Sequence, residues 1–262
     1  MPMRLSGNTI LITGATSGIG LELADQLQAL GNTVIVTGRD QIKLDSIGKE
    51  HPLLRAIQSD VSDPQAIASL YQRVSHQFPG LNVLINNAGI MRKINLQDKD
   101  CDLKDIGREI ETNLLGPIRM VKQFLPLLKS QPSAAIVNVS SGIAFSPFPI
   151  SPIYGSTKAG LHSFTQALRV QLKNTKVKVF ELAPPGTDTP LQGAFDAADL
   201  KGFPLMNVKR MVTAAIRGLE KDRLEILPGL SKVLRIGSRI APGLMVKAAS
   251  ASIDAMLAQT EH

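Results

Sequence analysis

The first chemical candidate is a tyrosine followed by a lysine, in Tyr154-Gly-Ser-Thr-Lys158. The chain's other tyrosine, Tyr71, has Ser75 at the corresponding position. Residues four positions apart share one face of a helix, so the Lys158 ammonium would stabilise a tyrosinate and lower the pKa of the phenol toward neutral pH. Such a phenol can pass a proton to or from a carbonyl or alcohol oxygen. A buried tyrosine beside a surface lysine is the structural alternative.

A serine precedes this tyrosine by 13 residues, at Ser141, directly after the apolar segment 136–139. That segment predicts a strand, and ligands of open parallel sheets bind at the carboxyl ends of the strands. Ser141 could donate a hydrogen bond to a substrate oxygen as charge develops there. Its neighbour Ser140 should face the other way, because successive side chains of a strand point to opposite sides.

Seven β-branched segments alternate with helical patterns along the chain, and they predict strands at residues 9–13, 33–37, 55–60, 83–86, 135–139, 177–182 and 225–227. Several are apolar on both faces of the pleat, which is typical of a parallel sheet covered by helices on each side. The predicted fold class is α/β, a doubly wound (Rossmann) seven-stranded parallel sheet flanked by helices. We expect one dinucleotide-binding and catalytic domain at residues 1–228 and a helical C-terminal tail at 229–262.

A glycine-rich loop follows the first predicted strand and precedes a helical pattern. Gly14 would permit a tight turn, Gly18 would let backbone N–H groups approach a pyrophosphate, and Gly20 would let the helix pack close to the sheet. A glycine turn without a ligand is the alternative. The predicted cofactor contacts in this loop are Gly14, Thr16, Ser17, Gly18, Ile19 and Gly20.

The second predicted strand ends in Gly38-Arg39, where an acidic residue would accept the ribose hydroxyl of NAD. Gly38 leaves room, and the planar guanidinium of Arg39 suits the additional phosphate of NADP. Asp40 would repel that phosphate if it pointed inward, whereas Lys43 could add positive charge. NADP is therefore predicted and NAD is less favoured; an ordinary surface arginine is the alternative.

Together these residues resemble the single-domain branch of the short-chain dehydrogenases/reductases. The resemblance covers about residues 5–228, and it rests on Thr13-Gly-x-x-x-Gly-x-Gly20, Asn86-Asn-Ala-Gly89, Asn113, Ser141, Tyr154-x-x-x-Lys158 and a proline-rich segment after the sixth predicted strand. Segments 81–89 and 177–191 resemble the DltE-like group of bacterial oxidoreductases within that family.

The resemblance implies a catalytic set. Tyr154 would be the general acid/base, Ser141 would orient the substrate, Lys158 would bind the nicotinamide ribose, and Asn113 would hold a water that links the lysine to solvent. Further cofactor contacts implied by position are Asp60, Val61, Asn87, Ala88, Gly89, Pro184, Thr187 and Thr189. Pro185 stands where the family usually has glycine, so this turn should be built differently. The family also forms homodimers and homotetramers through the helices corresponding to residues 105–128 and 154–173.

The predicted substrate pocket is apolar. The family's variable substrate loop corresponds to residues 190–207, which include Leu200 and Phe203, and it would face segment 143–150. Such a lining favours an apolar ketone or secondary alcohol over an anion, although the same residues could merely pack a lid. The predicted substrate contacts are Ser141, Ile143, Phe148, Tyr154 and Leu191.

The composition of the chain excludes several classes of protein. Hydrophobic residues make up 44% of the 262-residue chain and charged residues 19%, which excludes disorder, collagen and coiled coil. The chain has one cysteine and four histidines without ligand spacing, so we expect no metal site. It has no apolar run long enough for a leader or a membrane span, so we expect a cytoplasmic protein. The net charge of +7 comes with only 10 aromatic residues and no nucleic-acid motif, so we expect no nucleic-acid partner.

The tail carries Lys232, Arg235, Arg239 and Lys247 among apolar residues, in an amphipathic pattern broken at Pro242-Gly243. Three interpretations remain open: the tail lies on anionic lipid, covers a neighbouring subunit, or folds back on its own domain.

The leading functional hypothesis is an NADP(H)-dependent oxidoreductase acting on an apolar ketone or secondary alcohol. The alternative is a nucleotide-sensing regulatory protein of the same fold without turnover, which would need neither Tyr154 nor Ser141.

Overall fold

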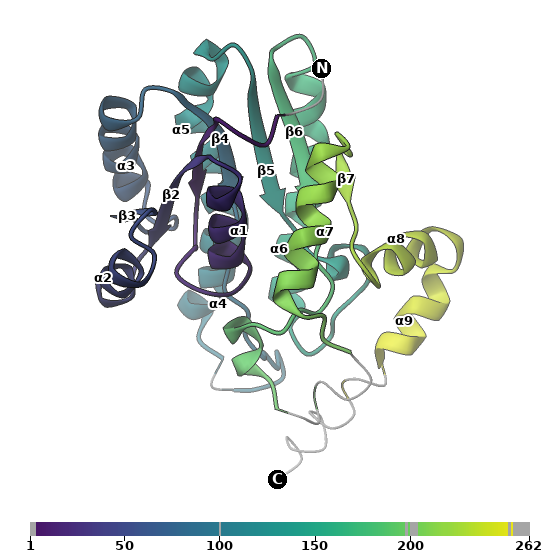
Figure 1. Cartoon of the computed structure of the whole chain (residues 1–262). Helices are drawn as coiled ribbons and strands as arrows, with labels where there is room; N and C mark the ends of the chain where they lie inside the picture. Colours follow the sequence, from purple (N-terminus) through teal and green to yellow (C-terminus); the bar gives the residue numbers. More distant parts are fainter. Residues whose placement is uncertain (1–3, 100, 197–198, 200–203, 251–252, 254–262) are drawn as a thin grey trace.

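A computed structural model describes residues 4–99, 101–196, 199, 204–250 and 253 (Figure 1). Its centre is a seven-stranded parallel sheet with the strand order β3-β2-β1-β4-β5-β6-β7. The strands are β1 (Thr9–Ile12), β2 (Thr33–Gly38), β3 (Arg55–Gln58), β4 (Leu81–Asn86), β5 (Ala134–Val139), β6 (Val177–Leu182) and β7 (Glu225–Ile226).

Helices cover both faces of the sheet, as the doubly apolar strands require. Ile10 and Ile12 of β1 belong to one core cluster, whereas Leu11 between them belongs to the other. The first cluster is covered by α1 (Gly18–Ala29), α2 (Gln41–Glu50) and α7 (Val208–Glu220). The second is covered by α3 (Pro64–Gln77), α5 (Gly116–Ser130) and α6 (Pro152–Gln171). The predicted fold class is confirmed.

The predicted strand boundaries differ from the observed ones by a few residues. The third strand was expected to reach Asp60 but ends at Gln58, because the Asp60 carboxylate accepts hydrogen bonds from the backbone and hydroxyl of Ser62 and so begins the turn into α3. The fourth begins two residues earlier than expected, at Leu81, which is fully buried and pairs with Thr9.

The connection from β4 to β5 contains α4 (Leu103–Ile110) and a π-helical turn (Glu111–Leu115), followed by α5. Short 3-10 helices follow β5 at Gly142–Phe145 and β6 at Pro190–Ala194.

Beyond β7 the chain forms α8 (Ser231–Ile240) and α9 (Pro242–Ser250), which Figure 1 shows at one side of the molecule, apart from the two helical layers. Pro242 begins α9, where its missing N–H breaks no helical hydrogen bond. Within the described residues, no helix is both long and apolar enough to cross a bilayer.

Candidate active site

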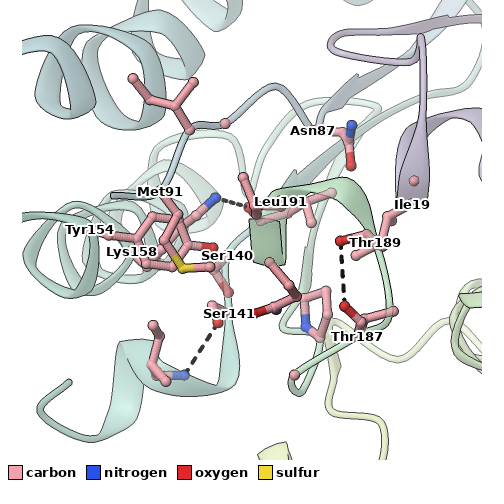
Figure 2. A pocket seen from close by; sticks show the side chains of 18 of the residues that line it. Ile19, Asn87, Met91, Ser140, Ser141, Tyr154, Lys158, Thr187, Thr189 and Leu191 are labelled. Carbon is pink, nitrogen blue, oxygen red and sulfur yellow. Dashed lines mark hydrogen bonds between the residues drawn. The ribbon is translucent and has the colours of Figure 1, made fainter. Parts of the chain in front are cut away.

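The loops at the carboxyl edge of the sheet surround a cavity of about 790 Å³ (Figure 2). Parallel strands deliver all these loops to the same edge, which is where open α/β sheets bind ligands. All the predicted site residues line the cavity except Gly20 and Asn113. The structure therefore brings together positions separated by more than 170 residues of sequence.

The glycine loop is shaped by its close approach to the loop after β4. Gly14 has φ +62°, and a Cβ on it would lie 2.5 Å from the Cα of Ala88. A Cβ on Gly20 would lie 2.4 Å from the Nδ2 atom of Asn87. That amide donates hydrogen bonds to the carbonyl oxygens of Thr13 and Gly14, at 3.0 and 2.9 Å. Glycine is therefore required at these positions, because any Cβ there would collide with the loop after β4.

The N-terminus of α1 faces the cavity with free donors. Ser17 is the N-cap residue, but its side chain makes no capping hydrogen bond, and the first turn contains no acidic residue. The backbone N–H groups of this turn and the positive end of the helix dipole are thus available to a pyrophosphate.

Arg39 and Lys43 border the same cavity beyond β2. Arg39 is exposed, and its guanidinium makes no ion pair within the described part of the chain. The Asp40 carboxylate caps α2 by accepting a hydrogen bond from the backbone N–H of Lys43 at 3.2 Å. One oxygen of Asp40 is therefore engaged in capping α2. The two cations Arg39 and Lys43 outnumber this single carboxylate where the cavity passes β2.

Tyr154 and Ser141 both line the cavity (Figure 2). Tyr154, in the first turn of α6, is only 5% exposed, and its phenol is hydrogen-bonded to the Ser141 side chain. Ser141 has an extended backbone directly after β5, and its Oγ accepts a hydrogen bond from the Ile143 N–H at 3.4 Å. Two hydroxyl groups from different elements can therefore converge on one substrate oxygen.

Burial raises the pKa of the Tyr154 phenol. The hydrogen bond from Ser141 opposes this rise, and the charge of the buried Glu109 carboxylate adds to it. The direction is the reverse of the lowering expected from the Tyr154-x-x-x-Lys158 spacing, because desolvation disfavours the phenolate.

Lys158 lies beneath the tyrosine and is 3% exposed. Its ammonium donates a hydrogen bond to the Val139 carbonyl at 2.9 Å and stands 5.5 Å from the centroid of the Tyr154 ring. Burial lowers the pKa of Lys158 to about 8. The predicted spacing on one helix face is thus realised, with the ammonium close to the ring.

Asn113 lies behind the cavity wall, fully buried in the π-helical turn. Its side chain accepts a hydrogen bond from the Ile90 N–H at 2.9 Å and donates to the Ile90 carbonyl at 2.8 Å. A Cβ on Gly89 would lie 3.4 Å from Asn113 Oδ1 and 3.7 Å from Lys158 Nζ, so the three residues are close neighbours. A π-turn of this kind often marks a functional position in a helix.

The proline-rich segment after β6 is tied to the loops on either side. The Pro184 carbonyl accepts a hydrogen bond from the Gly142 N–H at 2.7 Å, next to Ser141. The Thr187 hydroxyl donates to the Pro185 carbonyl at 2.8 Å, so the turn is braced by a side chain where Pro185 replaces glycine. The Thr189 side chain stands over Gly18, 3.2 Å from the position of a Cβ there.

The predicted substrate contacts Ile143, Phe148 and Leu191 pack against the cluster that contains Tyr154. Phe148 meets Phe195 edge to face at 5.9 Å. Leu200 and Phe203 of the predicted substrate loop lie outside the described residues. Sequence reasoning missed the apolar lining residues that come from the loop after β4 and from the tail: Ile90, Met91, Leu230, Val233, Leu234, Met245, Ala248 and Ala249.

Sequence reasoning also missed a carboxylate directly behind the serine pair. Glu181 is fully buried in β6 and accepts a hydrogen bond from the Ser140 hydroxyl at 2.5 Å. Its other oxygen lies 2.7 Å from Nδ1 of His162, one turn after Lys158 on α6. The sequence signal that could have revealed it is Glu181 itself, an acidic residue between the apolar Phe180 and Leu182 of the sixth predicted strand. The two serine hydroxyls have different partners, Glu181 for Ser140 and Tyr154 for Ser141, although both residues border the cavity.

The Glu181–His162 pair continues outward to α8. The His162 ring packs edge to face against Phe145 at 5.0 Å, and the Arg235 guanidinium lies 5.1 Å from the Phe145 ring centroid. Arg235 also pairs with Glu225 at 3.5 Å, and Gln166 links His162 to Glu225. This network connects the turn after Ser141 to the tail.

A family model described as "short chain dehydrogenase" matches residues 8–199 of the chain. Among curated proteins, the chain is similar to "Uncharacterized oxidoreductase DltE" of Bacillus subtilis (strain 168), with 40% identity over 239 residues, which are 90% of this chain and 94% of DltE.

Two solved structures have a similar fold. One is a short chain dehydrogenase from Burkholderia cenocepacia J2315 in complex with NADP, with a TM-score of 0.82 and 24% identity, covering 94% of this chain and 99% of that one. The other is a short chain dehydrogenase/reductase from Burkholderia phymatum in complex with NAD, with a TM-score of 0.80 and 21% identity, covering 90% of this chain and 95% of that one.

Proposed function

Because the chain belongs to the short-chain dehydrogenase family, in its DltE-like group of bacterial oxidoreductases, we propose that it transfers a hydride between NADP(H) and an apolar ketone or secondary alcohol. Tyr154 is the general acid/base. The observation that carries this proposal is the hydrogen-bonded pair of Tyr154 and Ser141 beside a buried Lys158, all three lining a cavity of about 790 Å³.

The residues around the cavity fit a nicotinamide dinucleotide. The close packing at Gly14 leaves no room for a Cβ, and the uncapped N-terminus of α1 offers donors to a pyrophosphate. Asp60 and Val61 line the end expected for adenine, and Asn87, Ala88 and Gly89 line the middle. When bound, the nicotinamide supplies the hydride for the carbonyl carbon.

The preference for NADP rests on Arg39 and Lys43. Both line the cavity beyond β2, next to Asp40. One oxygen of Asp40 caps α2, and the other lies 4.0 Å from the Lys43 ammonium, so the Arg39 guanidinium is the main group for a phosphate. A guanidinium forms strong charge-assisted hydrogen bonds with a phosphate. NADP complexes and NAD complexes both occur among the structural relatives, so this preference is argued from the residues of this chain alone.

The protein's own groups handle the proton. In the reducing direction, the substrate oxygen would accept hydrogen bonds from Ser141 and Tyr154, and the neutral phenol would donate its proton as negative charge develops there. The Lys158 ammonium, 5.5 Å from the ring centroid, would then stabilise the phenolate. Asn113 would hold a water that links Lys158 to solvent for the return of the proton.

The apolar wall of Ile143, Phe148 and Leu191 favours a substrate without charge beside the reacting carbon. We also include in the proposal a homodimer or homotetramer built through the α4–α5 and α6 helices. Exposed apolar side chains on these helices, Leu103 at 87% and Val170 at 65%, are compatible with such contacts.

Replacing Tyr154 by phenylalanine tests the function. We expect turnover of apolar ketones, followed by NADPH absorbance, to fall by a factor of roughly 100 to 10,000, because one general acid is lost. NADPH binding should be unchanged. Tyr71→Phe is the matched control, since that ring packs against Phe124 at 5.4 Å, in the core beside α3 and α5.

Full activity of the Tyr154→Phe variant would refute the proposed mechanism. Tight binding of NADPH by the unaltered protein, with no turnover across a broad panel of ketones and alcohols, would instead favour the nucleotide-sensing alternative.

A further inference from the structure

The hairpin of α8 and α9 presents an outward surface that mixes apolar and basic side chains. Lys232, Ile236, Arg239 and Ile240 follow one another at the spacing of a single helix face. Five large apolar side chains of α8 and α9 are unusually exposed for their type: Val233 at 62%, Ile236 at 48%, Ile240 at 78%, Leu244 at 69% and Val246 at 55%. Val233 borders the active-site cavity and is not part of the outward surface. On α9, Leu244 and Lys247 are three positions apart and share one face, whereas Val246, two positions from Leu244, does not. We call the basic-apolar face the set Lys232, Ile236, Arg239, Ile240, Leu244 and Lys247.

The hairpin is fixed to the domain, so this face has a definite orientation. Ser231 is fully buried, and a Cβ on Gly142 would lie 2.6 Å from its hydroxyl. Arg235 pairs with Glu225 and lies over the Phe145 ring. Met245 of α9 packs over Gly237 of α8, its sulfur 3.1 Å from the position of a Cβ there. These contacts hold the opposite side of the hairpin and leave the basic-apolar face outward.

The charge of the hairpin is of one sign. Residues 231–250 contain four basic and no acidic side chains. Arg235 is engaged with Glu225, whereas Lys232, Arg239 and Lys247 are exposed and make no ion pair within the described residues. The partner of this face should therefore be anionic.

The apolar side chains decide among anionic partners. A nucleic acid would neutralise the cations but leave the exposed isoleucine and leucine side chains in water. A second copy of the chain, joined by a two-fold axis through this face, would bring the same cations toward each other. An anionic bilayer surface accepts both kinds of side chain, because phosphates lie at the depth of the cations and acyl chains lie just beneath.

We propose that the basic-apolar face docks on a bilayer that contains anionic phospholipid. The opposite side of the hairpin lines the active-site cavity through Leu234 and Met245, and Ile253, just beyond α9, packs against the cluster around Tyr154. Docking would therefore place the cavity next to the phase in which apolar carbonyl compounds dissolve. Bilayer binding requires no turnover, so it can be tested independently of the proposed reaction.

The test is cosedimentation of the full chain with vesicles of phosphatidylglycerol and phosphatidylcholine in equal parts, and with vesicles of phosphatidylcholine alone. We expect binding to the anionic vesicles only, weakening as salt is added. Each cation near an anionic surface contributes about fivefold to partitioning, so the triple variant Lys232→Gln/Arg239→Gln/Lys247→Gln should bind roughly a hundredfold more weakly. The apolar variant Ile240→Ser/Leu244→Ser should also lose binding.

Matched controls carry the same substitutions elsewhere. Lys129→Gln/Lys173→Gln/Lys176→Gln removes three exposed charges near the amino ends of β5 and β6. Ile42→Ser/Leu53→Ser alters two side chains that are 83% and 63% exposed. Both control variants should bind vesicles like the unaltered protein, and all variants should retain NADPH binding if they are folded.

Three results would overturn the proposal. They are no binding to anionic vesicles, equal loss of binding in the control variants, and self-association in solution that the Ile240→Ser/Leu244→Ser substitution abolishes while vesicles have no effect. The last result would assign the face to a second copy of the chain.

Discussion

Replacing His162 by leucine should lower the free energy of unfolding by about 3–5 kcal/mol, because the substitution leaves a buried carboxylate without its nitrogen partner. Glu181 is fully buried, and its Oε2 lies 2.7 Å from His162 Nδ1. The remaining oxygen would keep only the hydrogen bond from Ser140. A buried charge that loses its partner costs far more than an ordinary hydrogen bond, whose removal costs about 1 kcal/mol.

The double variant Glu181→Leu/His162→Leu separates charge from packing. Replacing both members of a buried pair by apolar side chains is often close to neutral. We therefore expect the double variant to recover most of the stability lost in His162→Leu, apart from roughly 1 kcal/mol for the Ser140 hydroxyl that loses its acceptor. The single variant Glu181→Leu should cost at least the same roughly 1 kcal/mol for Ser140, so the coupling free energy of the cycle should be about 3–5 kcal/mol.

Urea unfolding followed by circular dichroism measures these differences, with NADPH binding as the check that each variant is native before urea is added. Thr165→Val is the matched control. It removes a different buried hydrogen bond between α6 and β5, from Asn138 Nδ2 to Thr165 Oγ1 at 2.9 Å. The reasoning is refuted if His162→Leu costs no more than Thr165→Val, or if the double variant costs the sum of the two single ones.

Three further predictions concern the cofactor and the proton. Arg39→Ala should weaken NADPH binding by roughly tenfold to a hundredfold and leave NADH binding unchanged; fluorescence titrations that give comparable affinities for both cofactors in the unaltered protein would contradict the role of Arg39. Gly14→Ala should abolish NADPH binding and lower the melting temperature, because φ is +62° and the added Cβ would lie 2.5 Å from the Cα of Ala88; a variant that binds like the unaltered protein would be inconsistent with this packing. Because burial lowers the pKa of Lys158 to about 8, the ammonium is present below that pH and lost above it; kcat/KM for ketone reduction should fall as the pH rises through about 8, and a flat profile there would show that the charge of Lys158 is not required.

The fold was predictable because its signal is local. The segment Ile10-Leu-Ile12 is apolar at every position, and a strand with two apolar faces has few environments other than a parallel sheet between helical layers. In the structure Leu11 packs on one side and Ile10 and Ile12 on the other. That the loops after the strands line one cavity was predictable for a similar reason, because turn residues such as Gly14 directly follow strands whose carboxyl ends must meet.

Partners distant in sequence were not predictable in this way. Nothing near His162 indicates that Glu181 will lie 2.7 Å away, because the contact depends on how α6 packs against β6. The same holds for Met245, which reaches the cavity only through the course of α8 and α9 after the last strand. The amphipathic pattern of the tail predicts a helix with a covered side, but not which part of the domain covers it.

The direction of the Tyr154 pKa shift was also not predictable from sequence spacing, and it bears on the proposed reaction. The spacing to Lys158 predicts a lowered pKa, yet the phenol lies among Ile150, Phe195 and Met91, where desolvation dominates and the pKa is raised. At neutral pH the tyrosine therefore holds its proton, which is the form that donates to a carbonyl oxygen. Forming the phenolate for alcohol oxidation must overcome this desolvation with the charge of Lys158, and that charge is itself lost above a pH of about 8. On the proposed mechanism the side chains of this site thus favour reduction near neutral pH, and raising the pH to favour the phenolate removes the ammonium that would stabilise it.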